Sequence, residues 1–184
     1  MPKDRMKLWF NSDAALDQQL KDLFTEDFTK LEKGEYEKWK DDHDGRLATV
    51  IMYDQFTRVM FRKDKKAFAF DDKALAISKQ MIANNYAELK KYHYFEMMFL
   101  CLPLEHSENK EDGNLSVFTF ETIAKWVEAD KSSTQKWAGM IKFAVDHNTT
   151  IQKFGRYPYR NAVLGRESTP EEVEYLKTAK TYGQ

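Results

Sequence analysis

Four positive charges and no acid lie in the stretch KFGRYPYRNAVLGR, residues 153–166. Gly155, Pro158 and Gly165 interrupt it and predict irregular backbone between aromatic side chains. The planar guanidinium of arginine suits bidentate binding of a carboxylate or a phosphate. The stretch therefore predicts contacts with an anion, which is either a bound ligand or a set of acids and helix carbonyls within the fold. Its polar side chains are Arg156, Arg160, Asn161 and Arg166.

A second charged pair lies on a helix predicted over residues 45–62. Apolar residues from Leu47 to Ile51 define one face of this helix by their i, i+3, i+4 spacing. Asp54 and Arg58 continue that face, so we expect an ion pair on the buried side, next to Gln55. Removing one partner of a buried pair typically costs about 3–5 kcal/mol. Such a pair is either a structural ion pair or part of a functional site.

Two histidines have the side-chain chemistry for proton transfer near neutral pH. His147 follows Phe143 on an apolar helical stripe, which fits a hydrogen-bonded core histidine or a proton donor. His106 lies in PLEHSE, next to Ser107 and Glu108. The spacing matches no zinc signature, so we predict no metal site. No nucleophile-elbow sequence surrounds Ser107, which disfavours a serine triad.

Composition excludes several classes of function. The chain has 184 residues, of which 42% are hydrophobic, enough for one packed domain. A net charge of −1 gives no basic field for nucleic acid, and the longest apolar run, MMFLCLPL, is too short to span a bilayer. The single cysteine, Cys101, lies in that run and is predicted to be a buried inert thiol. We therefore predict a cytoplasmic protein without nucleic-acid or membrane partners and without a cofactor.

Helical periodicity runs along the whole chain, and nothing predicts a strand ladder. We expect a single all-α domain over residues 1–184, with about seven or eight antiparallel helices in a superhelix or irregular bundle. Pro103 is predicted to end one helix, with another beginning near His106, and ENKEDGN at residues 108–114 to form a loop or a helix break. Thr169 and Pro170 open a capping box that starts a short terminal helix.

Several blocks of the sequence resemble one known family. These blocks are LWF, YDQFTRVMFR, AFAFDDKAL, PLEHSE and DHNTTIQKFGRYPYRNAVLGRESTPEE, and they occur in the family's order over nearly the whole chain. The chain is similar in them to the uncharacterised, mainly bacterial family catalogued as domain of unknown function 924. The resemblance implies an all-α fold of tetratricopeptide-like type and no established activity.

The family's polar signature falls on residues already selected by their chemistry. Three positions depart from the family pattern: Thr57 replaces a usual proline, Tyr159 a usual histidine, and Glu105 a usual apolar residue. If the family's histidine donates a proton, Tyr159 implies that this chain keeps the shape and loses that chemistry. The signature positions are Asp54, Gln55, Arg58, His106, Ser107, Glu108, His147, Arg156, Arg160, Asn161 and Arg166.

These residues together predict a cleft that binds a small anionic ligand, either a phosphate or a carboxylate compound. The four arginines and Asn161, Gln55 and Ser107 would bind the ligand, while His106, His147, Asp54 and Glu108 would serve catalysis in a hydrolase or an isomerase. The alternative is a non-catalytic helical module that binds a protein partner, with the polar cluster holding the fold together. The sequence leaves the oligomeric state open.

Overall fold

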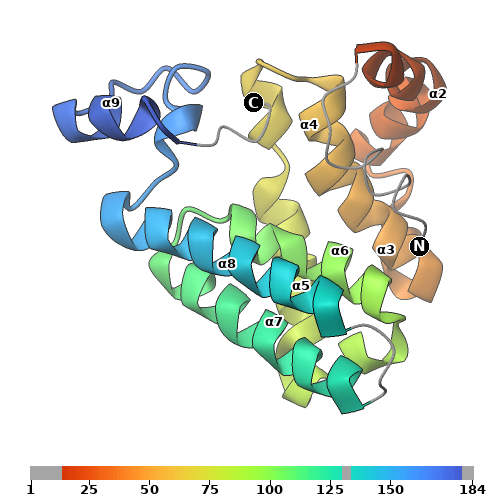
Figure 1. Ribbon diagram of the computed structural model, residues 1–184. Coiled ribbons are helices and arrows are strands. Elements are labelled where there is room, and N and C mark those ends of the chain that lie inside the picture. The colour runs from red at the N-terminus through yellow and green to blue at the C-terminus, as the bar shows by residue number, and fades with distance from the viewer. Residues whose placement is uncertain (1–13, 130–133, 180–184) are drawn as a thin grey trace. The chain divides into compact units, whose positions relative to one another are not determined.

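The computed structural model describes residues 14–129 and 134–179 (Figure 1). Within these ranges every regular element is helical, which confirms the predicted all-α class. The chain divides into two compact units, one made of Met1–Phe70 with Pro158–Gln184 and the other of Asp71–Tyr157. A single domain over residues 1–184 and a tetratricopeptide-like arrangement stay predictions. The LWF motif lies outside the described residues.

The first unit has an aromatic core between its helices. Its elements are α2 (Ala14–Glu32), α3 (His43–Val50), the π-helical segment Ile51–Phe56, α4 (Thr57–Met60) and α9 (Pro170–Leu176), with short 3₁₀ turns at Glu37–Asp41, Lys65–Phe68 and Pro158–Arg160. Phe28 of α2 is 1% exposed and its ring lies 5.3 Å from Phe61 and 5.1 Å from Phe70. Tyr53 stacks on Phe70, with 5.4 Å between the ring centroids. Burial of these rings stabilises the unit.

The predicted helix over residues 45–62 exists, but its middle is π-helical. Helices α3 and α4 are joined by the π-helical segment Ile51–Phe56. In a π-helix each main-chain hydrogen bond spans five residues instead of four. Four consecutive residues of this segment are buried, from Met52 to Gln55. An amphipathic α-helix buries only one face, so this segment, with Asp54 and Gln55 both inside, is packed on more than one side. Thr57 follows at once, and its hydroxyl donates to the main-chain oxygen of Tyr53 at 2.7 Å.

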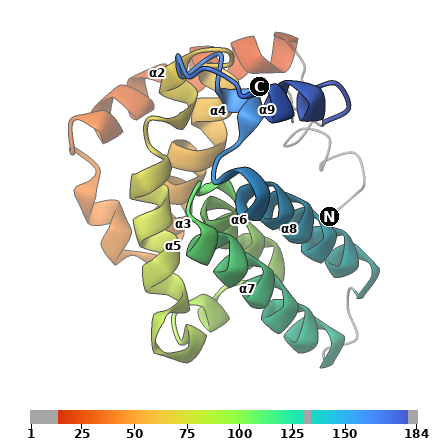
Figure 2. The same cartoon turned by 90° about the vertical axis from the view of Figure 1, so that its left-hand side faces the viewer.

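The second unit is a set of packed helices around α6. Its elements are α5 (Asp71–Tyr86), the 3₁₀ turn Leu89–Lys91, α6 (Tyr94–His106), α7 (Lys110–Ala129) and α8 (Thr134–Phe154). Helices α7 and α8 lie side by side and antiparallel in both views of the ribbon (Figures 1 and 2). Every residue from Met97 to Glu105 is buried, so α6 has neighbours on all sides. The residues at its C-terminal end are therefore placed with little freedom.

Two of the predicted helix boundaries are wrong. Helix α6 runs through Pro103 to His106, and α7 already begins at Lys110, so only the first part of ENKEDGN is a connection. Proline in a helix interior costs one hydrogen bond, and in α6 the surrounding packing outweighs that cost. Asn109 starts α7 instead of breaking it, because its side-chain oxygen accepts from the main-chain nitrogens of Glu111 and Asp112 at 2.8 and 3.1 Å. The capping box at Thr169 is confirmed at the start of α9.

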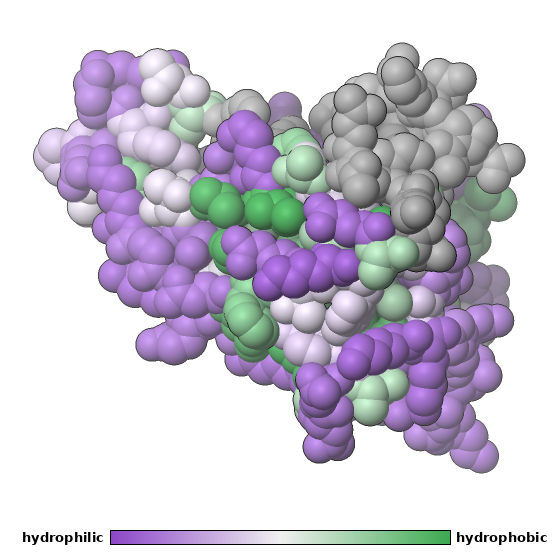
Figure 3. All heavy atoms as spheres, turned by 60° about the horizontal axis from the view of Figure 1, so that its bottom comes forward, coloured by the Kyte–Doolittle hydropathy of each residue, from purple (hydrophilic) through white to green (hydrophobic). Residues whose placement is uncertain are grey.

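The described helices present mainly polar surface to solvent. Figure 3 shows a face on which rows of hydrophilic side chains enclose a short strip of hydrophobic ones. Among residues 14–129 and 134–179, no helix combines the length and the apolar character that crossing a bilayer requires. The charged residues, 32% of the sequence, are thus largely accounted for by solvated helix faces.

A close backbone approach at Gly45 generates the first prediction. A Cβ atom there would lie 2.5 Å from the main-chain oxygen of Trp39, and that oxygen cannot rotate away. We expect Gly45→Ala to lower the free energy of unfolding by about 1–3 kcal/mol, through overpacking. Gly139→Ala is the matched control, because nothing lies within 4 Å of the added Cβ atom in α8. That change should raise stability by about 0.5–1 kcal/mol, through the higher helix propensity of alanine.

Urea denaturation of both variants measures these changes. Equal stability effects of the two substitutions would show that the contact between Gly45 and Trp39 does not constrain the start of α3.

Candidate functional site

A buried ion pair joins Asp54 to Arg58, as the sequence predicts. Asp54 is 0% exposed and the Arg58 side chain 11% exposed, with 3.4 Å between Oδ1 and Nη1. The same Nη1 donates to the main-chain oxygen of Asp54 at 2.5 Å, so the arginine folds back onto its own helix. Gln55 completes the cluster, because its Nε2 donates to the other carboxylate oxygen at 2.6 Å. Both oxygens of the carboxylate are thus held by side chains of the same helix.

Arg160 and Arg58 converge on one aromatic ring within the first unit. The Arg160 Cζ lies 4.7 Å from the centroid of Phe68, and the Arg58 Cζ lies 5.7 Å from the same centroid. Both distances are in the range of cation–π attraction. Arg160 is only 4% exposed, and its Cζ lies 5.7 Å from the Tyr159 ring. A buried and a partly buried guanidinium group therefore share one side chain, Phe68, which the sequence does not indicate.

Asn161 and Arg166 brace the loop that leads into α9. The Arg166 Nε donates to Asn161 Oδ1 at 3.0 Å, and the main-chain nitrogen of Arg166 donates to the main-chain oxygen of Asn161 at 2.8 Å. Asn161 Nδ2 donates to Ser168 at 3.0 Å and to the carboxylate of Glu172 at 3.2 Å. Glu172 is 2% exposed and also caps α9 by accepting from the main-chain nitrogen of Thr169. These contacts give both predicted ligand-binding residues a loop-forming role.

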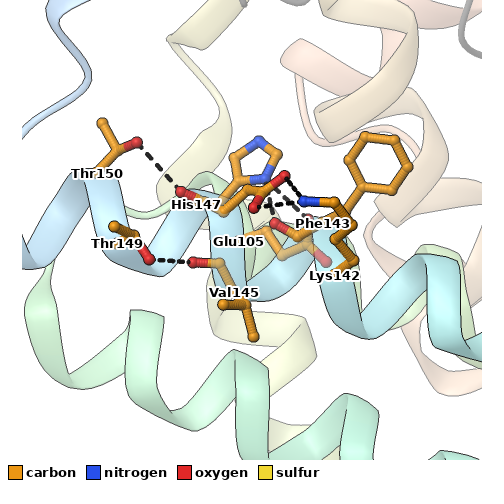
Figure 4. A network of polar contacts seen from close by, with 8 residues as sticks. Glu105, Lys142, Phe143, Val145, His147, Thr149 and Thr150 are labelled. Carbon is orange, nitrogen blue, oxygen red and sulfur yellow. Dashed lines mark hydrogen bonds and ion pairs between the residues drawn. The ribbon is translucent and has the colours of Figure 1, made fainter. Parts of the chain in front are cut away.

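In the second unit a histidine and a carboxylate are buried together (Figure 4). His147 of α8 is 7% exposed and Glu105 of α6 is 3% exposed. The His147 Nδ1 lies 3.4 Å from a carboxylate oxygen of Glu105 and 2.8 Å from the main-chain oxygen of Phe143. Both neighbours are acceptors, so this geometry favours the tautomer with the hydrogen on Nδ1. In the sequence, Glu105 stands out only as a departure from the family pattern, and helical periodicity does not link it to His147.

Tyr157 fixes the segment that contains Glu105 and His106. Its hydroxyl donates to the main-chain oxygen of Glu105, and its main-chain nitrogen donates to the Glu108 carboxylate at 2.9 Å. The ring lies edge-on to His147 at 5.7 Å between centroids. The rings of His106 and His147 are 6.2 Å apart. Glu108, predicted as a catalytic acid, thus contacts the backbone of Tyr157, while the two imidazoles lie near each other.

Ser107 contacts an acid instead of an imidazole. Its hydroxyl donates to Asp112 Oδ2 at 2.8 Å, and Lys79 of α5 pairs with the other oxygen of Asp112 at 2.6 Å. Asp112 is 5% exposed, so this link ties the start of α7 to α5. Arg156, the remaining predicted ligand-binding residue, is half-buried in the same unit.

Cys101 is fully buried in α6, as the apolar run predicts. Burial raises the pKa of its thiol far above the ordinary range, and the negative charge of Glu105 raises it further. A thiolate is therefore not formed near neutral pH in the folded state. Within the part of the chain that the structure describes, no three His, Cys, Asp or Glu side chains form a group that could hold a metal ion.

Six of the eleven candidate residues form two groups, each within one unit. Arg58, Arg160, Asp54 and Gln55 form a cluster in the first unit, to which the structure adds Phe68. His106 and His147 lie near each other in the second unit, to which the structure adds Glu105 and Tyr157. Helical spacing predicts the Asp54–Arg58 pair because the two residues lie four positions apart on one helix. Glu105 and Tyr157 come from other elements and have no spacing signal in the sequence.

The fold and the buried polar pairs define an all-α protein with internal charge clusters, without pointing to a known enzyme class. The chain belongs to the family described as "Bacterial protein of unknown function (DUF924)", whose model matches residues 1–180. This membership confirms the resemblance found in the sequence. No curated protein matches the chain.

A solved structure has a similar fold. It is that of the protein of unknown function ATU0120 from Agrobacterium tumefaciens, with 25% sequence identity and a TM-score of 0.77. The match covers 97% of this chain and 91% of that one. The similarity supports the all-α fold over nearly the whole length and assigns no activity.

The Asp54–Arg58 pair generates the second prediction. Asp54→Asn removes a fully buried charge and leaves Arg58 without its carboxylate partner, so we expect a loss of about 3–5 kcal/mol in the free energy of unfolding. Asp146→Asn is the matched control, because Lys142 and Asp146 form an exposed pair at the same i,i+4 spacing. That change should cost about 0.5 kcal/mol or less. Urea denaturation compares the two, and similar losses would contradict the structural importance of the buried pair.

Proposed function

We propose that the first unit binds a small anion, a phosphate or a carboxylate, between the guanidinium groups of Arg58 and Arg160. The observation that carries this proposal is the convergence of both groups on the ring of Phe68, at 5.7 and 4.7 Å. Arg160 is 4% exposed and the Arg58 side chain is 11% exposed, so both positive charges lie where there is little solvent. A bound anion would reduce the repulsion between the two arginines and accept their hydrogen bonds.

The arrangement of Arg58 supports binding with little reorganisation. Its Nη1 is occupied by the carboxylate and the main-chain oxygen of Asp54, which fixes the plane of the guanidinium. Gln55 in turn fixes the Asp54 carboxylate. A guanidinium held in advance loses less conformational entropy when a ligand binds, which increases affinity. Asp54 and Gln55 would thus act as positioning residues, and the two arginines would contact the anion.

The third prediction is a thermal shift with inorganic phosphate, sulfate and succinate, at constant ionic strength set by sodium chloride. An anion at about a hundredfold its dissociation constant adds roughly 2.7 kcal/mol, which raises the melting temperature by several degrees. Arg160→Met and Arg160→Lys should lose most of this shift, the lysine variant because it keeps the charge but lacks the fork.

Arg62→Met is the matched control, because Arg62 belongs to the same unit and pairs with Asp17 at 2.8 Å. This variant should be somewhat less stable and still shift with the anion. An equal shift in wild type, Arg160→Lys and Arg62→Met would mean that the anion acts without the arginine pair and would refute the proposed site.

The second candidate is an interaction module, which exposed apolar side chains on α7 and α8 favour. Phe118 is 58% exposed, Phe143 42% and Val145 41%, all in the second unit. A contiguous exposed apolar patch is a feature of protein-binding surfaces, so this alternative requires that these side chains lie together. Under this alternative no anion in the panel shifts the wild type, and Arg160→Met loses stability without any ligand effect.

A further inference from the structure

We infer that His147 is an acid–base group that works through Nε2, with Glu105 as its positioning residue. The inference concerns the second unit alone and does not depend on the anion site of the first. Its basis is the geometry at the other ring nitrogen, Nδ1, which faces the main-chain oxygen of Phe143 at 2.8 Å and the Glu105 carboxylate at 3.4 Å.

Two acceptors at Nδ1 determine which nitrogen can titrate. A carbonyl and a carboxylate both need a hydrogen from the ring, so Nδ1 keeps its hydrogen in the neutral and in the charged imidazole. The proton that comes and goes is therefore the one on Nε2. This nitrogen lies on the opposite side of the ring and points away from Glu105 (Figure 4).

The groups around the ring favour a reversible change of charge. Glu105 and His106 face it from α6, and Tyr157 faces it from the segment after α8. The negative charge of Glu105 favours the imidazolium, whereas burial and the neighbouring His106 favour the neutral ring. We therefore expect the ring to take up and release a proton within the folded protein.

The backbone around Glu105 is fixed before any ligand binds. Tyr157 holds the main-chain oxygen of Glu105 through its hydroxyl, and Glu108 holds the main-chain nitrogen of Tyr157. The dyad is thus set by contacts between α6 and the end of α8 within one unit. In a proton transfer, the imidazolium would release its Nε2 proton to the ligand and remain as the neutral ring with hydrogen on Nδ1. Glu105 would stay ionised throughout.

A purely structural histidine makes a different prediction. A histidine that serves the fold alone is kept neutral by burial, and it takes up a proton only when the protein unfolds. An acid–base group changes its charge in the folded protein near neutral pH. The two interpretations are therefore separated by the protonation state of each nitrogen, measured without any ligand or substrate.

The experiment is a long-range ¹H–¹⁵N NMR spectrum of the four histidine side chains, recorded from pH 5 to pH 9 on the full-length protein. His147→Asn identifies the resonances of His147. We expect Nδ1 to stay protonated at every pH and Nε2 to lose its proton within this range, while the backbone spectrum stays that of the folded protein. An Nε2-protonated neutral tautomer would overturn the inference, and so would the absence of any titration in the folded state.

Glu105→Gln tests the positioning residue by a second readout. Removing the carboxylate should lower the proton affinity of the imidazole about tenfold, because the nearby negative charge is lost. Asp146→Asn is the matched control: it removes a carboxylate from α8 that pairs with Lys142 at 2.9 Å instead of the ring. An equal effect of both variants would overturn the role of Glu105. If Glu105→Gln does not fold, the tautomer of the wild-type ring still decides the inference.

Discussion

The first unit is organised around one constraint, the need to compensate the fully buried carboxylate of Asp54. An ionised carboxylate in a protein interior is tolerated only when charged and hydrogen-bonding partners surround it. Arg58 supplies the charge and Gln55 supplies a donor, and both lie within four residues of Asp54 along the chain. Local spacing alone therefore brings the compensating groups to the buried carboxylate.

The two units compensate buried charge in the same way. Arg58 contacts a carboxylate and the main-chain oxygen of Asp54, four residues earlier. His147 also contacts a carboxylate and the main-chain oxygen four residues earlier, that of Phe143. In each case a nitrogen-containing side chain folds back along its own helix and is fixed at one nitrogen by two oxygens. This shared geometry restricts the orientation of both groups, which both proposals require.

Local spacing in the sequence was enough to predict the helical class, the Asp54–Arg58 pair and the capping box at Thr169. Each of these depends on residues within one or two helical turns. The π-helical turn was not predictable, because Ile51–Phe56 has the composition of an ordinary amphipathic helix. The partnership of Glu105 with His147 depends on the packing of α6 against α8, which no pattern encodes. Pro103 shows the reverse case, since a strong local signal for a helix end is overridden where every neighbouring residue is buried.

The family match and the similar solved structure support the fold and assign no chemical activity to the buried clusters. The central claim is that Arg58 and Arg160 bind one anion together. The most direct measurement follows the arginine Nε–Hε resonances in ¹H–¹⁵N spectra while inorganic phosphate is added at constant ionic strength. The account predicts that the resonances of Arg58 and Arg160 shift along one common saturation curve, while Arg62, paired with Asp17, does not move. Unchanged Arg58 and Arg160 resonances, or an equal unsaturated drift of all three, would contradict it.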